Sequence, residues 1–168
     1  MAEKEEREAV IKELNTWIGT PYNPNQMVKG RQGGVDCAML LVGVYGNVGL
    51  LPEGFDPRPY PTQWHLHQRE ERYLNIVVQF AHEVPAPTGP GDIAMFKIGR
   101  TYAHGGIITT WPRMVHAFSG WLVTEFDVSK NTTGKYALAR LPQRFFSMWG
   151  ESKIINRVSE PLRVMGCA

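Results

Sequence analysis

Apolar positions in the first half of the chain repeat with the period of a helix. In residues 3–18 they share one helical face, and Gly19 follows where a helix commonly ends; the face comprises Val10, Ile11, Leu14, Trp17 and Ile18. Residues 38–45 are apolar on every side, and Asp36 stands where an N-cap is expected. The pattern predicts an amphipathic first helix and a buried second helix.

Turn-forming residues separate the predicted helices. Residues 20–35 contain two prolines and three glycines, and residues 52–61 contain four prolines, so we predict a long loop in each place. Residues 62–81 return to helical spacing and predict a third helix. The first of these loops leads directly to Cys37, at the start of the buried helix.

The second half of the chain changes to short apolar runs between turn residues. These runs predict five strands, at residues 92–98, 104–110, 113–118, 122–128 and 135–141. Connections of hairpin length, such as Trp111-Pro112 and Ser119-Gly120, favour an antiparallel meander. Because helices come first and strands follow, the fold class is α+β.

Composition agrees with one globular domain. The 168 residues are 43% hydrophobic and 20% charged. We expect a single catalytic domain over residues 1–150 that packs through Phe145, Phe146 and Trp149, and a C-terminal tail, 151–168, in part disordered. The net charge of +2 comes from interspersed acidic and basic residues, which argues against a nucleic-acid partner.

The first residues are charged and acidic rather than basic and then apolar, so we predict no signal peptide. No stretch approaches the roughly 18 apolar residues of a membrane span. We therefore expect synthesis in the cytoplasm, with any action outside the cell requiring another means of delivery.

Only two cysteines occur, Cys37 and Cys167, too few for a disulfide framework. A single disulfide between them stays open, although a cysteine next to the C-terminus is rarely held firmly. Cys37 begins the predicted buried helix, where partial positive charge favours a thiolate nucleophile. The Gly33-Gly34 pair before it leaves room for a substrate backbone, and the Cys37 amide is a candidate oxyanion donor. The alternative is that Cys37 is an inert buried side chain.

Two of the five histidines lie on consecutive predicted strands. His104 and His116 become cross-strand neighbours in an antiparallel hairpin, which gives a general base and a residue that orients it. Each is otherwise an ordinary core or surface histidine. A zinc site built from His65 and His67, with His82 or Cys37, is the rival use, but its spacing is poor. We expect no metal and no cofactor.

Five short motifs, in order, resemble the NlpC-type cell-wall peptidases, which are papain-like cysteine hydrolases. They are Gly19-Thr20-Pro21-Tyr22, Val35-Asp36-Cys37-Ala38, Pro90-Gly91-Asp92-Ile93, His104-Gly105-Gly106-Ile107 and Met114-Val115-His116-Ala117. The resemblance implies a catalytic triad of Cys37, His104 and His116. It also places Tyr22, with Gly34 and Asp36, on the oxyanion and substrate-binding side, where Asp36 caps the helix.

Two departures from the family pattern concern the substrate side. Ala38 stands where the family usually has serine, and Asn23-Pro24-Asn25 with a longer insertion replaces the usual Trp-Gly-Gly. The catalytic residues therefore match better than the substrate pocket does.

The resemblance implies hydrolysis of peptide bonds in peptidoglycan stem peptides. It also suggests a member associated with a phage tail or prophage, with tail proteins as partners and a virion or another route carrying the enzyme to the cell wall. Two alternatives stay open: a tail-assembly or structural protein that kept the fold and lost turnover, and an acyltransferase or deamidase.

Overall fold

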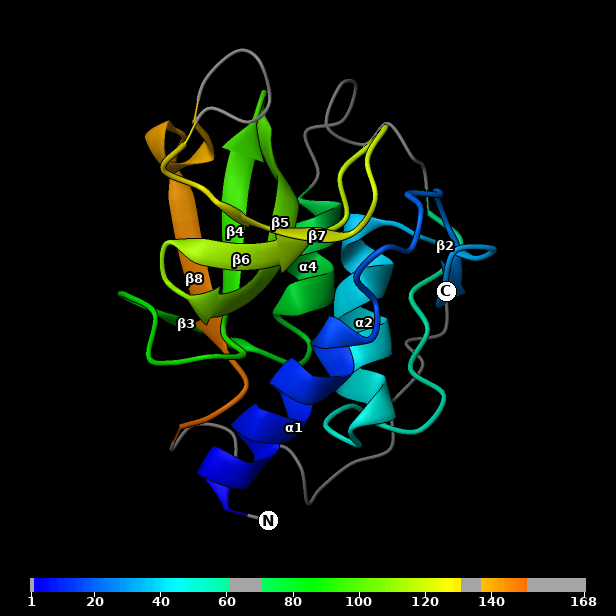
Figure 1. Ribbon diagram of the computed structural model, residues 1–168. Coiled ribbons are helices and arrows are strands. Elements are labelled where there is room, and N and C mark those ends of the chain that lie inside the picture. Colours follow the sequence, from blue (N-terminus) through cyan, green and yellow to red (C-terminus); the bar gives the residue numbers. More distant parts are fainter. Residues whose placement is uncertain (1, 61–70, 131–136, 151–168) are drawn as a thin grey trace, which may run out of the picture.

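Three helices cover one face of an antiparallel sheet in the computed structural model, which describes residues 2–60, 71–130 and 137–150 (Figure 1). The helices are α1 (Glu3–Asn15), α2 (Cys37–Asn47) and α4 (Arg72–Val77). The predictions for the start of the third helix, for His65, His67 and Cys167, and for the tail lie outside the described residues.

Helix α1 confirms the first prediction but ends three residues earlier than expected. Val10 and Leu14 are buried on its inner face, and Thr16 is the C-cap. Trp17 is still buried, although it lies beyond the helix. The chain then turns at Gly19, whose φ of +89° is a conformation that favours glycine.

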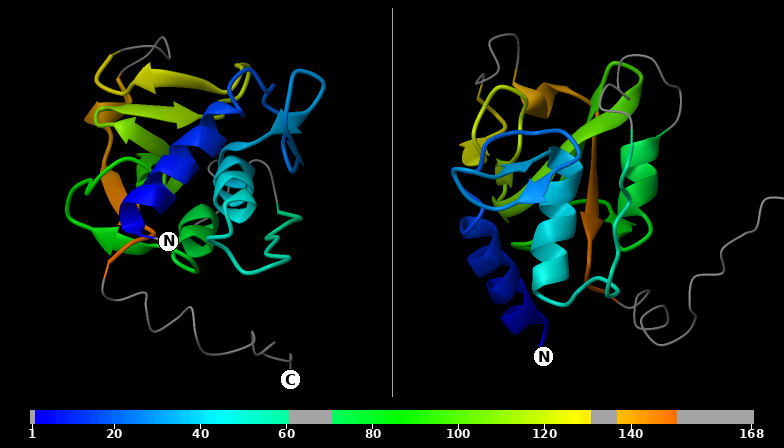
Figure 2. Two further views of the ribbon diagram at one scale, coloured as in Figure 1. Left: turned by 60° about the horizontal axis from the view of Figure 1, so that its bottom comes forward. Right: turned by 90° about the vertical axis from the view of Figure 1, so that its right-hand side faces the viewer.

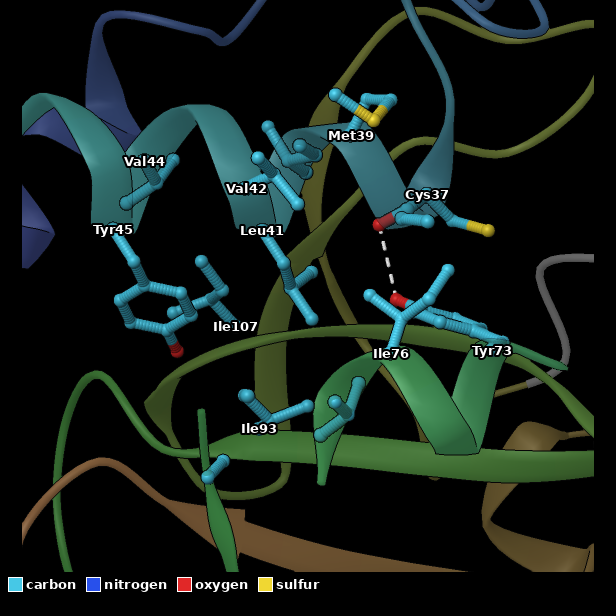
Figure 3. Close-up of a cluster of buried hydrophobic side chains, with 14 of the residues drawn as sticks. Cys37, Met39, Leu41, Val42, Val44, Tyr45, Tyr73, Ile76, Ile93 and Ile107 are labelled. Atoms are coloured by element: carbon cyan, nitrogen blue, oxygen red, sulfur yellow. Dashed lines mark hydrogen bonds between the residues drawn. The ribbon is translucent and has the colours of Figure 1, made fainter. Parts of the chain in front are cut away.

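Helix α2 is the central element, and it confirms the second prediction. Its residues 37–45 are all buried. Asp36 is the N-cap, because its side chain accepts hydrogen bonds from the amides of Ala38 and Met39. Figure 3 shows Cys37 at one end of this helix and Tyr45 toward the other, above buried side chains from α4 and the sheet.

The predicted long loop at 20–35 contains a small hairpin that the sequence analysis missed. Strand β1 (Met27–Val28) pairs antiparallel with β2 (Gly34–Val35). Each strand has only two residues, too short for an alternating pattern to be visible in the sequence.

The sheet has six strands in the order β3-β8-β4-β5-β6-β7, and every pairing is antiparallel. The strands are β3 (His82–Val84), β4 (Ile93–Ile98), β5 (Thr101–Thr110), β6 (Arg113–His116), β7 (Thr124–Asp127) and β8 (Gln143–Ser147). The predicted meander is confirmed for β4 to β7. Strand β8 breaks the meander by returning to lie between β3 and β4.

The prediction of a fifth strand at 135–141 was wrong for its described part. Leu138–Arg140 forms a 3-10 helix, η1, and the strand follows it as β8. Alanine and leucine favour helix, whereas the aromatic pair Phe145-Phe146 suits a strand. Phe146 and Trp149 are buried and Phe145 is partly buried, so the packing predicted for them is confirmed.

Alternate residues of the strands enter two cores. Ile93 and Met95 of β4 face the helices, whereas Ala94 and Phe96 belong to a second cluster on the other face with Leu138 of η1. Figure 2 shows the helices gathered on one side of the sheet. The α+β class is therefore confirmed. No helix of the described residues is long and apolar enough to cross a membrane.

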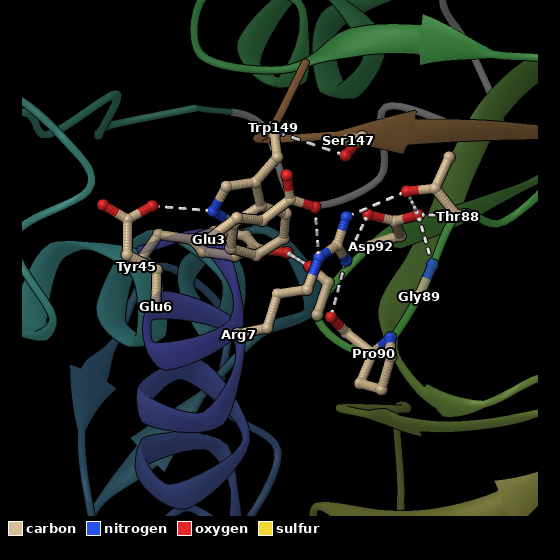
Figure 4. Close-up of polar contacts among 11 residues, drawn as sticks. Glu3, Glu6, Arg7, Tyr45, Thr88, Gly89, Pro90, Asp92, Ser147 and Trp149 are labelled. Atoms are coloured by element: carbon tan, nitrogen blue, oxygen red, sulfur yellow. Dashed lines mark hydrogen bonds and ion pairs between the residues drawn. The ribbon is translucent and has the colours of Figure 1, made fainter. Parts of the chain in front are cut away.

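Helix α1 is tied to the loop before β4 by a buried ion pair. Arg7 donates to Asp92 at 3.0 Å and to the Pro90 carbonyl at 2.8 Å (Figure 4). The Arg7 guanidinium also stacks over Trp149, 4.0 Å from the ring centroid. These contacts join the N-terminal helix to the last residues of the described chain.

Candidate active site

Cys37 is the first residue of α2, and its sulfur points toward strand β5. The side chain is 7% exposed, and Sγ lies 3.9 Å from the carbonyl oxygen of Ala103, the residue before His104. Asp36 occupies the amides of Ala38 and Met39, and the Leu40 amide donates to the Asp36 carbonyl. Of the first four amides of the helix, that of Cys37 is the one left to bind an oxyanion.

Two opposing influences act on the Cys37 thiol. Burial raises its pKa well above the ordinary value, and the negative charge of Asp36 adds to this effect. The backbone amides of Ala38, Cys37 and Gly105 act in the opposite direction. Burial dominates, so the sulfur is a neutral thiol at pH 7 until a base removes its proton.

His104 on β5 and His116 on β6 lie side by side. Nε2 of His104 and Nδ1 of His116 share a hydrogen bond of 2.9 Å, and both rings are buried. The residue closest to His116 across the hairpin is Gly106, where an added Cβ would lie 3.2 Å from the His116 Cβ. The pair therefore meets diagonally across the two strands rather than directly opposite.

Both imidazoles are neutral at pH 7. Burial lowers the pKa of His104 to about 4 and that of His116 to about 2, where His104 contributes as well. The His116 ring stacks on Phe126 with centroids 3.9 Å apart, and Phe118 packs edge-on against His104 at 5.1 Å. Because the shared bond uses Nε2 of His104, its Nδ1 is the nitrogen left to accept a proton from the thiol.

One cavity of about 180 Å³ brings the predicted residues together. Its lining includes Tyr22, Asp36, Cys37 and His104, and the remaining lining residues are uncharged: Pro24, Tyr60, Ile98, Ala103, Ala117, Phe118 and Ser119. His116 does not line the cavity and is linked to it by its hydrogen bond to His104. A substrate in this cavity therefore meets the sulfur and the imidazole at once.

Tyr60 is a member of the site that the sequence analysis missed. Its hydroxyl donates to the Asp36 carboxylate, with both oxygens 2.8 Å away, and the Asn25 amide donates to Oδ2 at 2.7 Å. Asp36 thereby ties the N-terminus of α2 to two loops. Tyr60 stands in a proline-rich loop, and no periodicity or spacing links it to Cys37.

Tyr22 and Gly34 have different surroundings. Burial raises the Tyr22 pKa, and Cys37 and Asp36 raise it further when they are ionised, so the Tyr22 hydroxyl keeps its proton and can donate to an oxyanion. Gly34 lies in β2 and is not among the cavity residues. A Cβ there would clash with the Gln26 side chain and with Asn23 Cβ, so the loop leaves no room for a side chain at this position.

The described residues contain no group of three His, Cys, Asp or Glu side chains that could hold a metal ion. The rival zinc site needs His65 and His67, which lie outside these residues. His82 lies in β3, and its Nδ1 is buried without a hydrogen-bond partner.

Comparisons with known proteins support the fold. No protein-family model matches the sequence, and no curated protein matches it. Solved structures do match. The NlpC/p60 domain of the peptidoglycan hydrolase SagA gives a TM-score of 0.54 at 16% identity, over 82% of this chain and 96% of that one.

Two mycobacterial structures match over a similar span. The peptidoglycan hydrolase RipB from Mycobacterium tuberculosis gives a TM-score of 0.55 at 19% identity, over 88% of this chain and 67% of that one. RipD from the same species is described as a non-catalytic NlpC/p60 protein adapted to peptidoglycan binding. It gives a TM-score of 0.53 at 13% identity, over 86% of this chain and 98% of that one. The chain therefore has the papain-like fold of the NlpC/p60 domains.

Proposed function

We propose that the protein is an NlpC/p60-type cysteine hydrolase that cleaves peptide bonds of peptidoglycan stem peptides. The observation that carries the proposal is that Cys37 and His104 line the same cavity, with His104 bonded at 2.9 Å to His116. Peptidoglycan is the substrate class because SagA and RipB, which share the fold, are peptidoglycan hydrolases.

The first half of the reaction forms a thioester. Nδ1 of His104 takes the proton of the Cys37 thiol as the sulfur attacks the peptide carbonyl. The oxyanion that forms accepts hydrogen bonds from the Cys37 amide and the Tyr22 hydroxyl. When the intermediate collapses, the carbon–nitrogen bond breaks, and the amine leaves with the proton that His104 held.

The second half restores the enzyme. His104 takes a proton from water as the water oxygen attacks the thioester, and it returns that proton to the departing sulfur. The products are a carboxyl group and the free thiol. His116 accepts the hydrogen bond of the His104 Nε2–H and keeps the ring oriented, while its own low pKa prevents it from taking the proton.

A binding protein of the same fold is the second candidate. The burial of Cys37, only 7% exposed, and the match to non-catalytic RipD favour it. Presentation of the protein by a phage tail or virion stays a proposal based on the sequence alone.

The test is incubation of purified muropeptides with the wild type and with Cys37→Ala, followed by mass spectrometry of the products. We expect the wild type to give a new amine and a new carboxyl terminus, and Cys37→Ala to give neither. Cys167→Ala is the matched control and keeps activity. Cleavage by Cys37→Ala contradicts the mechanism. A wild type that binds muropeptides without cleaving them favours the binding protein, and a product with a new amide or ester favours acyl transfer.

A further inference from the structure

Two large apolar side chains lie exposed beside the cavity. Trp121 is 50% exposed and Leu122 is 54% exposed. They follow the turn at Ser119-Gly120, and Ser119 itself lines the cavity. Exposed apolar side chains that gather at one place usually mark a binding surface.

Backbone hydrogen bonds tie the segment that carries these side chains to the cavity wall. The Trp121 amide donates to the Phe118 carbonyl at 3.0 Å, and the Trp121 carbonyl accepts from the Tyr22 amide at 3.1 Å. Leu122 pairs with Pro21 in an antiparallel bridge. Because Phe118 and Tyr22 both line the cavity, Trp121 is fixed between two segments of its wall. We call the surface formed by Pro21, Tyr22, Trp121 and Leu122 the Trp121 rim.

The Trp121 rim is uncharged as well as apolar. Neither residues 17–28 nor residues 117–123, the two segments that build it, contain Asp, Glu, Lys or Arg, although charged residues make up 20% of the chain. A surface for an anionic membrane would carry lysines and arginines. A surface for the ionisable groups of a stem peptide would carry countercharges. The rim therefore suits a neutral ligand with an apolar face.

We propose that the Trp121 rim binds a neutral N-acetylated sugar ring of the glycan strand to which the stem peptide is attached. This inference rests on the proposed function, because it extends the same substrate beyond the cavity. The face of a pyranose ring presents C–H groups with partial positive charge, and the face of an indole carries negative π density, so the two stack. The sugar hydroxyl groups stay in water, and no charge is buried.

The size of the cavity supports a substrate whose scissile peptide bond lies in the cavity and whose sugar lies outside it, on the Trp121 rim. A volume of about 180 Å³ accommodates only the residues next to the scissile bond. The rest of the substrate must lie along the protein surface. Trp121 is exposed there and is hydrogen-bonded through its backbone to Tyr22 and Phe118, which both line the cavity.

A binding experiment tests the proposal without requiring turnover. The inactive Cys37→Ala protein, labelled with ¹⁵N, is titrated with a β-1,4-linked tetramer of N-acetylglucosamine. We expect saturable shifts of the Trp121 indole signal and of the Tyr22 and Leu122 amides. We expect the amide shifts to disappear in the double variant Cys37→Ala/Trp121→Ala and to persist in the double variant Cys37→Ala/Trp121→Phe. Val78→Ala is the matched control, because Val78 is also 50% exposed but lies at the end of α4, outside the rim.

A kinetic experiment measures the same contact during cleavage. Two substrates are compared, the stem peptide alone and the stem peptide attached to its disaccharide. We expect Trp121→Ala to lower kcat/KM about tenfold for the disaccharide substrate, the size of one aromatic contact, and to leave the free peptide unchanged.

Three results overturn the proposal: no shift with the tetrasaccharide, an equal loss on both substrates, or a Trp121-dependent affinity for phosphatidylglycerol vesicles in place of the sugar. Failure of the proposed function looks different. If neither peptide is cleaved but the tetrasaccharide still binds at Trp121, the sugar site stands and the hydrolase does not.

Discussion

Helix α2 connects two buried polar regions that differ in how they treat charge. At its N-terminus, Cys37 and His104 line one cavity and His116 is bonded to His104, and we call these three residues the thiol end. Near its C-terminus, the Tyr45 hydroxyl donates to the Gly91 carbonyl at 2.6 Å, next to the Arg7–Asp92 pair, which we call the arginine cluster. Figure 3 shows Cys37 and Tyr45 on α2, and Figure 4 shows the arginine cluster.

In the arginine cluster every charge is neutralised. The Asp92 carboxylate has no exposed surface, and it accepts from Arg7, from the amides of Thr88 and Gly89 and from the Thr88 hydroxyl. A buried carboxylate requires such partners, because an unpaired one would cost several kcal/mol. This region contributes to holding α1, the loop before β4 and Trp149 together.

At the thiol end the sulfur and the two imidazoles carry no charge at rest, and the nearby charge is that of the helix-capping Asp36. The described contacts of Cys37 Sγ include one weak hydrogen bond at 3.9 Å, and the two histidines share one bond. Burial keeps all three groups neutral. The comparison teaches that a buried charge that is fully paired stabilises the fold, whereas buried groups that stay neutral and sparsely bonded remain able to exchange a proton.

The largest expected effect concerns the base. His104→Ala removes the proton acceptor, and we expect kcat/KM for muropeptides to fall by about 10⁴-fold, the upper range for a general base. His116→Ala leaves the base in place but less well oriented and costs less, about 100-fold. Circular dichroism confirms that both variants are folded. An equal loss from His116→Ala would assign the base role to the pair rather than to His104.

The next effect concerns stability alone. Asp92→Ala removes the buried counterion of Arg7, which keeps only the more exposed Glu3, and leaves the Thr88 and Gly89 amides without their acceptor. We expect the free energy of unfolding to fall by about 3–5 kcal/mol in urea titrations. The exposed pair Arg144–Glu83, opened by Arg144→Ala, is the matched control and costs about 1 kcal/mol or less. Asp92→Ala protein that is still folded at low temperature keeps its kcat/KM. A selective loss of kcat would mean that the arginine cluster also positions the nucleophile.

Most of the helical layer and the central meander could be predicted from the sequence, because their patterns are local. The apolar run of α2 and the N-cap at Asp36 are visible within a dozen residues. The edges of the sheet were not predictable. Strand β3 has three residues, and β8 pairs with strands some fifty to sixty positions earlier, so neither shows a local signal.

The candidate site also contains residues that a local sequence pattern predicts and residues that no local pattern predicts. Cys37, His104 and His116 stand in short motifs, and Tyr22 follows a recognisable turn. Tyr60 and Tyr73 reach the site from a loop and a helix that have no spacing relation to Cys37. Gly34 was predicted on the substrate side because a glycine near a nucleophile suggests access; in the structure the Asn23 and Gln26 side chains take the space that a Cβ at this position would need.

A smaller effect concerns pH. The folded histidines have pKa values of about 4 and 2, whereas unfolded histidine titrates near 6.5, so between those values the unfolded chain binds more protons. The free energy of unfolding therefore decreases as the pH falls below 6.5. We expect a loss of about 2 kcal/mol for each histidine between pH 7 and pH 5. Urea titrations measure it, and His116→Gln, which cannot take up a proton, reduces the loss by about half. A variant with the same pH dependence as the wild type would show that His116 is not buried as a neutral ring.

The smallest effect tests the comparison most directly, because both regions contain a buried tyrosine that donates to a backbone carbonyl. Tyr73 of α4 donates to the Cys37 carbonyl at 3.0 Å, and Tyr45 donates to Gly91 at the other end of α2. Tyr73→Phe and Tyr45→Phe each lose one hydrogen bond, and we expect each to lower the free energy of unfolding by about 1 kcal/mol.

Of these two tyrosines, only Tyr73 contacts the residue that carries the nucleophile. An added Cβ at Gly105, the residue after His104, would lie 3.0 Å from the Tyr73 hydroxyl, so Tyr73 packs between the backbone that carries the thiol and the backbone that carries the base. We therefore expect Tyr73→Phe to lower kcat about three- to tenfold, because a displacement of about 1 Å between reacting groups costs about 100-fold. Tyr45→Phe leaves kcat unchanged. Equal kcat values in the two variants would mean that Tyr73 stabilises α4 without aligning the sulfur and the imidazole, and that the thiol end depends on α2 and β5 alone.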